Sequence, residues 1–320
     1  MDFDDNIKEA RDKTYKHYKS EVAASNWLLF LSTVLPYHGI ALLIFWRMGW
    51  LFFNETWGGP YLIFISAHII FGMLFTLIVD ALTLYSLGAR NERFFMQEEK
   101  FLIELYAEAL NSTKEAHPHL YKTLSPTDNT PKTGKTPLYI VDDIDINAYA
   151  TGFGIILTKG AINGLSHDEI KGFMAHELGH FNFPIFMNFL KGFMFVGAFA
   201  VAIYKYIKKY TGVEVTFKKD GTETTIKSNS YVSVFLDFVF LVPSYYFKFV
   251  SSLCFRTNEF RADYIAVLAG YGEGLKNGLR MIYNFELMRK YSLMDRLIAT
   301  HPPTAKRIVE IERLLDTEHY

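Results

Sequence analysis

The chain has 320 residues, enough for one or two domains with a substantial core. Its formal net charge is −1, so composition gives no support to a nucleic-acid partner. Cys254 is the only cysteine, which excludes an intrachain disulfide framework. Half of the residues are hydrophobic, and they gather in a few long stretches separated by polar segments.

Four of these hydrophobic stretches are candidates for membrane-spanning helices. They comprise residues 27–46, 61–79, 183–204 and 231–254. The first two contain no Asp, Glu, Lys or Arg, and each has about the 20 residues that a helix needs to cross a bilayer. The third contains Lys191 and the fourth contains Asp237 and Lys248, so these two either span the membrane or lie against its surface. Their length favours spanning.

The polar segments have patterns typical of helices and strands. Residues 1–26 predict a polar, helical arm, and residues 89–111 predict a further helix. Residues 137–141 indicate a strand, and residues 146–162 indicate a strand, a glycine-containing turn and a second strand. A polar hairpin with an Asp-Gly turn is predicted within residues 205–230. Together these elements predict an α+β protein that is mainly helical and carries a small β-sheet.

The segment SHDEIKGFMAHELGHF predicts a helix that carries chemistry. Ser166 and Glu169 fit a capping box at its start. His176 and His180 form H-E-x-x-H with Glu177, and they share one helix face, so both imidazoles can bind one zinc ion at about 2.0–2.1 Å. Glu177 is offset from this pair and can act as the general base toward water. The predicted buried face comprises Ile170, Phe173, Met174 and Leu178.

A catalytic zinc ion needs a third protein ligand, and the best candidate lies in RTNEFRADYIA. Glu259 can supply that ligand, and Asp263, one helical turn later, can accept the second ring N–H of a ligating histidine. Taken alone, this E-x-x-x-D spacing is also typical of a solvated helix face. Arg256 and Arg307 are either buried partners of acidic groups or solvated surface residues.

These segments resemble the gluzincin membrane peptidases typified by the HtpX protease and, more distantly, the CaaX prenyl protease. The resemblance covers residues 138–310 and the two hydrophobic stretches before them. It rests on INAYATG, AHELGH, FRTNEFRAD and THPP. The family implies one zinc ion held by His176, His180 and Glu259, with Glu177 as base. It further implies that Asn147 and His301 lie near the cleft and stabilise the tetrahedral intermediate.

The resemblance also implies a division of the chain. The predicted parts are a polar arm (1–26), a transmembrane helix pair (27–89), the first part of a metalloprotease domain (90–182), a second helix pair with a polar hairpin (183–254) and the second part of that domain (255–320). Arg90 and Arg93 favour a cytoplasmic active site by the positive-inside rule, whereas the lysine-rich residues 205–230 oppose it.

The function predicted from these residues is zinc-dependent endopeptidase activity in a bacterial membrane, on protein or peptide substrates that include misfolded membrane proteins. An extended substrate would pair along the 146–158 strand edge. Asn147 can instead satisfy a turn, and His301 can cap or pack in a His-Pro-Pro turn. Alternative functions are a CaaX-type prenyl-protein protease and a non-catalytic membrane scaffold or transporter component. In the scaffold, Asp80, Lys191 and Asp237 would matter more than the histidines.

Overall fold

The computed structural model describes most of the polar elements of the chain. The described residues are 3–29, 31–32, 66, 70, 78, 80–117, 137–151, 154–180, 214–219, 222–227, 231–287 and 301–318. The chain divides into two compact units, one of residues 1–28, 77–185 and 252–320 and the other of residues 29–76 and 186–251. The first unit contains every candidate site residue.

A small mixed sheet forms one part of the first unit. Its strands are β1 (Arg90–Asn91), β2 (Leu138–Val141), β3 (Ala148–Thr151) and β4 (Gly154–Thr158), in the order β1-β2-β4-β3. β2 runs parallel to β4, while β1 and β3 are antiparallel to their neighbours. The predicted strand in 137–141 is confirmed, and so are two strands within 146–162, but residues 159–162 are helical instead. β3 lies at the edge of the described sheet.

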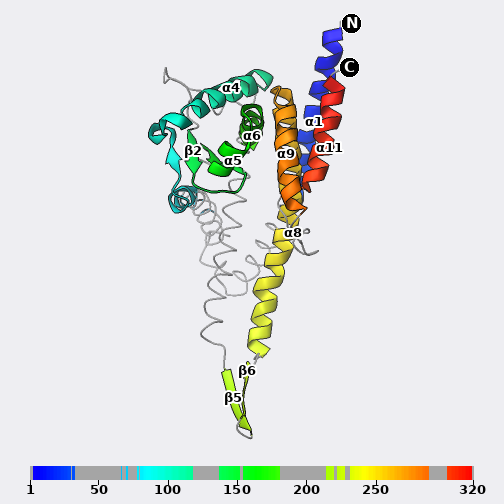
Figure 1. Ribbon diagram of the computed structural model, residues 1–320. Helices are drawn as coiled ribbons and strands as arrows, with labels where there is room; N and C mark the ends of the chain where they lie inside the picture. The colour runs from blue at the N-terminus through cyan, green and yellow to red at the C-terminus, as the bar shows by residue number, and fades with distance from the viewer. Residues whose placement is uncertain are drawn as a thin grey trace, which may run out of the picture. The chain divides into compact units, whose positions relative to one another are not determined.

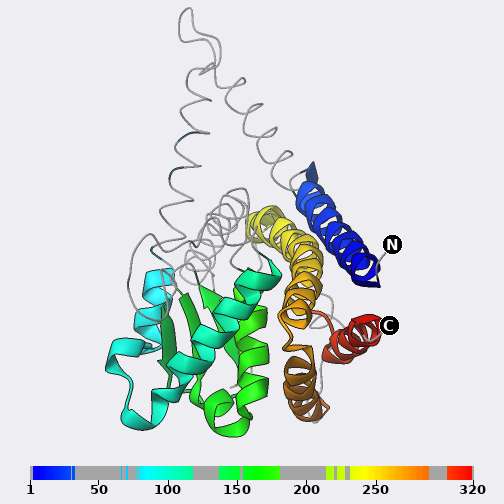
Figure 2. The same ribbon diagram turned by 90° about the horizontal axis from the view of Figure 1, so that it is seen from above.

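Helices complete the first unit. They are α1 (Phe3–Leu29), α4 (Phe101–Ala116), α5 (Lys159–Gly164), α6 (His167–His180), α9 (Gly272–Glu286) and α11 (Thr304–Glu318), together with the C-terminal part of α8 (Tyr231–Leu268). Among them, α5 and α6 pack against the sheet. Figures 1 and 2 show α4 and α6 alongside the sheet. α9 packs against both α6 and α11. A mainly helical chain with a small sheet is thus confirmed.

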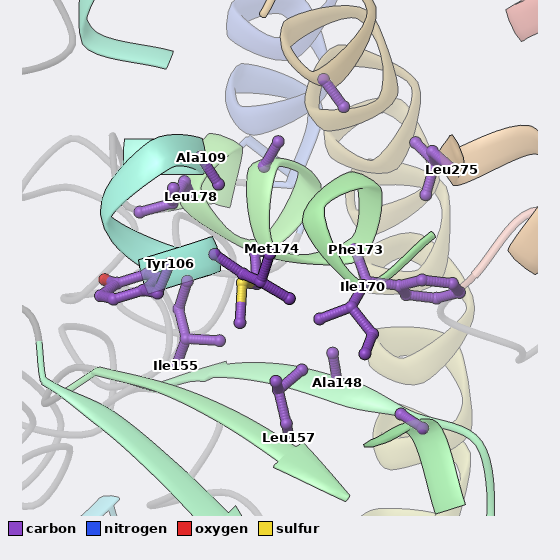
Figure 3. Packing of buried hydrophobic residues seen from close by; sticks show 14 of the residues in the cluster. Tyr106, Ala109, Ala148, Ile155, Leu157, Ile170, Phe173, Met174, Leu178 and Leu275 are labelled. Atoms are coloured by element: carbon purple, nitrogen blue, oxygen red, sulfur yellow. The ribbon is translucent and has the colours of Figure 1, made fainter. Parts of the chain in front are cut away.

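The core of the first unit lies between α6 and the sheet. Figure 3 shows Met174 and Ile170 of α6 directed toward Ile155 and Leu157 of β4. All four side chains are buried, and each contributes about 1.5–3 kcal/mol through burial. Phe173 and Leu178 are buried as well, so the predicted inner face of this helix is confirmed.

Other elements differ from their sequence pattern. Residues 89–111 do not form one helix, because β1 and two short 3₁₀ turns, η3 (Glu92–Phe94) and η4 (Gln97–Glu99), precede α4. The buried Glu99 carboxylate explains this arrangement, since it accepts two hydrogen bonds from the Arg90 guanidinium at 2.7 and 3.0 Å and one from the backbone N–H of Met96. Helix α5 was not predicted.

The second unit contains the predicted hairpin. β5 (Glu214–Lys219) and β6 (Thr222–Lys227) pair antiparallel. The stretches 27–46 and 61–79 lie largely outside the described residues, and 183–204 lies entirely outside them. Within the described ranges, no helix is both long enough and apolar enough to cross a membrane. The predicted spans and domain boundaries stay predictions.

Close approach between α6 and α9 depends on glycine. A Cβ atom at Gly172 would lie 2.4 Å from the backbone nitrogen of Leu275. We expect Gly172→Ala to force the two helices apart and to lower the free energy of unfolding by about 1–3 kcal/mol, measured by chemical denaturation. Gly164→Ala is the matched control, because its Cβ would meet only the flexible Ile146 side chain at 3.2 Å. Equal stability of the two variants would contradict the prediction.

Candidate metal centre

Helix α6 presents two histidines on one face. Its N-terminus is fixed by the predicted capping box, in which the Ser166 N–H donates to Glu169 Oε2 at 2.7 Å and the Glu169 N–H donates to Ser166 Oγ at 3.4 Å. One turn apart at the other end, the Nε2 atoms of His176 and His180 lie 3.1 Å from each other. The imidazoles therefore converge on one point.

Glu259 of helix α8 completes a group of three potential metal ligands. One carboxylate oxygen lies 3.4 Å from His176 Nε2, and the other lies 3.4 Å from His180 Nε2. The helices can approach this closely because Gly179 faces Ala262, whose Cα would be 2.9 Å from a Cβ at the glycine. One ligand atom from each of the three residues lies within 4.8 Å of the others. The predicted ligands are thus brought together.

Behind this group, Asp263 and Arg307 form a buried ion pair. Asp263 Oδ1 accepts from His176 Nδ1 at 2.8 Å, which directs the other ring nitrogen toward Glu259. The Arg307 guanidinium donates to both Asp263 oxygens, from Nη2 at 2.6 Å and from Nε at 2.9 Å. Its Nη1 lies 3.2 Å from Glu259 Oε2. Arg307 therefore contacts both carboxylates.

The charges of the cluster shift one another's pKa values. Burial opposes ionisation of Glu259, but the adjacent His176, His180 and His301 hold its pKa well below the usual range. Burial likewise opposes ionisation of Asp263, and Arg307 and His176 lower its pKa. Burial and the Arg307 charge disfavour protonated His176, yet the two carboxylates raise its pKa to about 9. Asp263 and Glu259 raise the pKa of Arg307. The carboxylates are thus ionised at neutral pH.

Glu177 is the candidate base, and it lies in α6 directly after the first histidine. Its side chain is buried, with 7% exposed. Burial raises the pKa of the Tyr149 phenol in β3, and the carboxylates of Asp143, Asp145 and Glu177 add to this increase. Glu177 is therefore close enough to the edge strand to act on it electrostatically.

His301 and Asn147 occupy different positions relative to the cluster. His301 Nδ1 lies 3.0 Å from Glu259 Oε2, and its side chain is 69% exposed. Asn147 precedes β3, where its side-chain amide donates to the Tyr149 hydroxyl at 2.9 Å and its Oδ1 accepts from the Ala148 N–H at 2.9 Å. The structure therefore brings His301 to the ligands, while the side-chain hydrogen bonds of Asn147 run along the strand. Their catalytic roles stay predictions.

Two features of the site were not predicted from the sequence. Arg307 could not be separated from a solvated arginine, because its partners lie on a different helix. The contact between Gly179 and Ala262 was also missed. Both are small residues within the two motif segments, and this was the one available signal of a close helix crossing.

The residues present fit a divalent metal ion. Glu259 Oε2 is buried and has no hydrogen-bond partner of good geometry among the described residues. The two Nε2 atoms face each other and the carboxylate. Because His176 Nδ1 donates to Asp263, deprotonation of this ring leaves a lone pair on Nε2 at the point where the three residues converge. A cation between two nitrogen donors and one oxygen donor would satisfy all three, and this donor set is typical of catalytic metal sites.

An H-E-x-x-H helix beside an edge strand, with a third ligand from a later helix, is the arrangement of a metallopeptidase. Residues 119–315 match Peptidase family M48. Because this match covers more than half of the 320 residues, the chain belongs to peptidase family M48, whose members are metallopeptidases. The predicted resemblance is confirmed at the level of the family.

Curated relatives carry the name HtpX. The chain is 26% identical over 237 residues to a "Protease HtpX homolog" of Dictyoglomus turgidum, which covers 66% of this chain and 74% of the relative. It is 23% identical over 260 residues to a "Protease HtpX homolog" of Campylobacter curvus, and this alignment covers 72% of this chain and 86% of the relative. It is 25% identical over 214 residues to "Protease HtpX" of Vibrio cholerae serotype O1, and this alignment covers 61% of this chain and 72% of the relative.

Among solved structures, the chain is similar to Ste24p of S. mikatae, with a TM-score of 0.46 and 22% sequence identity. The alignment covers 92% of this chain and 67% of that chain.

Metal binding should release a proton from His176. Because its raised pKa of about 9 exceeds the ordinary value of 6.5, the proton stabilises the protein below about pH 6.5, and this contribution is lost as pH rises through about 9. A metal ion that binds His176 must displace this proton, so affinity should increase with pH up to about 9. Calorimetric titration with zinc at pH 7.5, in buffers of different ionisation enthalpy, measures the release. Buffer-independent heats would contradict it.

Proposed function

We propose that the chain is a zinc-dependent endopeptidase anchored in a membrane. The observation that carries this proposal is the convergence of His176, His180 and Glu259 beside Glu177 in a member of peptidase family M48. Two histidines and one glutamate are the protein ligands that catalytic zinc uses in several peptidases. When bound, zinc polarises the scissile carbonyl and lowers the pKa of a water molecule toward about 7.

The protein residues supply the proton transfers and the charge stabilisation. Glu177 takes a proton from water and passes it to the leaving amine. Its burial strengthens its electrostatic interactions, because the surrounding dielectric is low. His301 lies at the exposed side of Glu259 and can donate to the oxygen that becomes negative on the substrate. Asn147 is the second candidate donor, once its amide turns away from Tyr149.

The edge strand β3 can hold an extended substrate by pairing with it. Among the described strands, β3 pairs with β4 alone. The Thr158 N–H donates to the Asn147 carbonyl, so alternation along an antiparallel pair directs the N–H and C=O groups of Ala148 and Ala150 outward. These are the groups that an added strand would use. Because α6 packs against β3, a bound chain would pass beside Glu177.

Membrane anchoring and the substrate class rest on the sequence. The uncharged stretches 27–46 and 61–79 have spanning length, and the first unit collects chain from both sides of them. Pairing through backbone groups tolerates many sequences, which suits removal of misfolded membrane proteins. Arg90 and Arg93 favour a cytoplasmic site, although the lysine-rich residues 205–230 oppose it. Metal analysis of the detergent-purified protein separates this proposal from a scaffold, since a scaffold requires no zinc.

Replacement of the base tests the mechanism. We expect Glu177→Gln to keep zinc bound, because Glu177 is not among the ligands, and to lower cleavage of casein by at least about 100-fold. Glu108→Gln is the control, since this exposed residue pairs with Lys171 away from the ligands. Wild-type cleavage by Glu177→Gln, or chelator-resistant cleavage by the unchanged protein, would refute the proposal.

Removal of one outward N–H group tests the binding mode. Ala150→Pro removes the N–H that a paired substrate would accept from, and proline is tolerated at a sheet edge. One lost hydrogen bond of about 1 kcal/mol should raise KM about fivefold and leave kcat nearly unchanged. Ala150→Gly keeps the N–H and is the matched control. Equal KM values for the proline and glycine variants would exclude pairing at this position.

A further inference from the structure

Arg307 is a buried cation that contacts both Glu259 and Asp263 of helix α8. It begins the second turn of α11, and 7% of the residue is exposed. Two of its nitrogens donate hydrogen bonds, and the third lies within ion-pair distance of a carboxylate. Nη2 and Nε hold Asp263 at 2.6 and 2.9 Å, and Nη1 lies 3.2 Å from Glu259. A planar guanidinium matches this geometry, since its donors are arranged in a rigid fork.

The two carboxylates need such a partner. Glu259 and Asp263 lie one turn apart on α8, with 5% and 0% of each residue exposed. Two negative charges so close repel each other, and burial of an uncompensated charge costs several kcal/mol. Without a fixed cation, either carboxylate would turn toward water or take up a proton. Asp263 would then no longer hold the ring of His176.

We propose that Arg307 is a positioning residue for the metal centre. It fixes the Asp263 carboxylate so that Oδ1 accepts from His176 Nδ1, and it holds the Glu259 carboxylate facing both Nε2 atoms. This inference rests on the proposed zinc site. Arg307 also docks the start of α11, and the His301 loop that precedes this helix reaches Glu259. One arginine thereby couples the C-terminal helix to Glu259 directly and to His176 through Asp263.

The test is Arg307→Lys, which keeps the charge and removes the fork. Outer partners of metal ligands typically contribute 10–100-fold to metal affinity, and we expect a loss of about that size in zinc affinity, measured by chelator competition. Arg313→Lys is the matched control, because this exposed arginine lies on the same helix and pairs with Glu310. It should bind zinc within about twofold of the unchanged protein.

The visible spectrum of the cobalt-substituted protein separates positioning from general stability. Cobalt bands report the geometry of the ligands, so Arg307→Lys should shift them at saturating cobalt, and Arg313→Lys should not. In an Asp263→Asn background, Arg307→Lys should cost less affinity than it does alone, because part of its effect passes through Asp263. Unchanged affinity and bands in Arg307→Lys, or fully additive losses, would overturn the inference. Absence of zinc binding by the unchanged protein would instead overturn the proposed function, and this inference with it.

Discussion

The close crossing of α6 and α8 is the constraint on which the site depends. A carboxylate side chain is short, so Glu259 reaches two imidazoles only if the helix axes approach closely. Gly179 and Ala262 permit this approach, because a larger residue at either position would separate the backbones. The sheet and α4 hold one side of α6, and α9 holds another through its own glycine contacts. The surrounding fold thereby fixes the distance between the ligands.

Charge balance explains why the cluster is stable in a buried site. Two ionised carboxylates face one arginine, and these carboxylates raise the pKa of His176, which favours one more positive charge beside them. A proton on His176 supplies that charge in one state, and a metal ion can supply it in another. The same negative electrostatic field would therefore favour either a proton or a metal ion at this point.

The sequence predicted what short-range chemistry determines. Ser166 and Glu169 specified the start of α6, and the spacing of its apolar residues specified its buried face. The pairing of His176 and His180 followed from helix geometry, because residues i and i+4 share one helix face. Helix α5 was hidden because its six residues follow a strand directly, and Thr158 both ends that strand and caps the helix. Arg307 could not be assigned, because its role depends on a tertiary contact with no sequence period.

The edge strand β3 carries a local hydrogen bond at the position where an added strand would pair. Asn147 Oδ1 accepts a hydrogen bond from the outward N–H of Ala148, and an added strand would need the same N–H as a donor. A substrate that paired there would displace this contact and leave the Asn147 amide beside the bound chain. The side chain thus protects an otherwise open edge in the free protein, where unpaired strand groups favour aggregation.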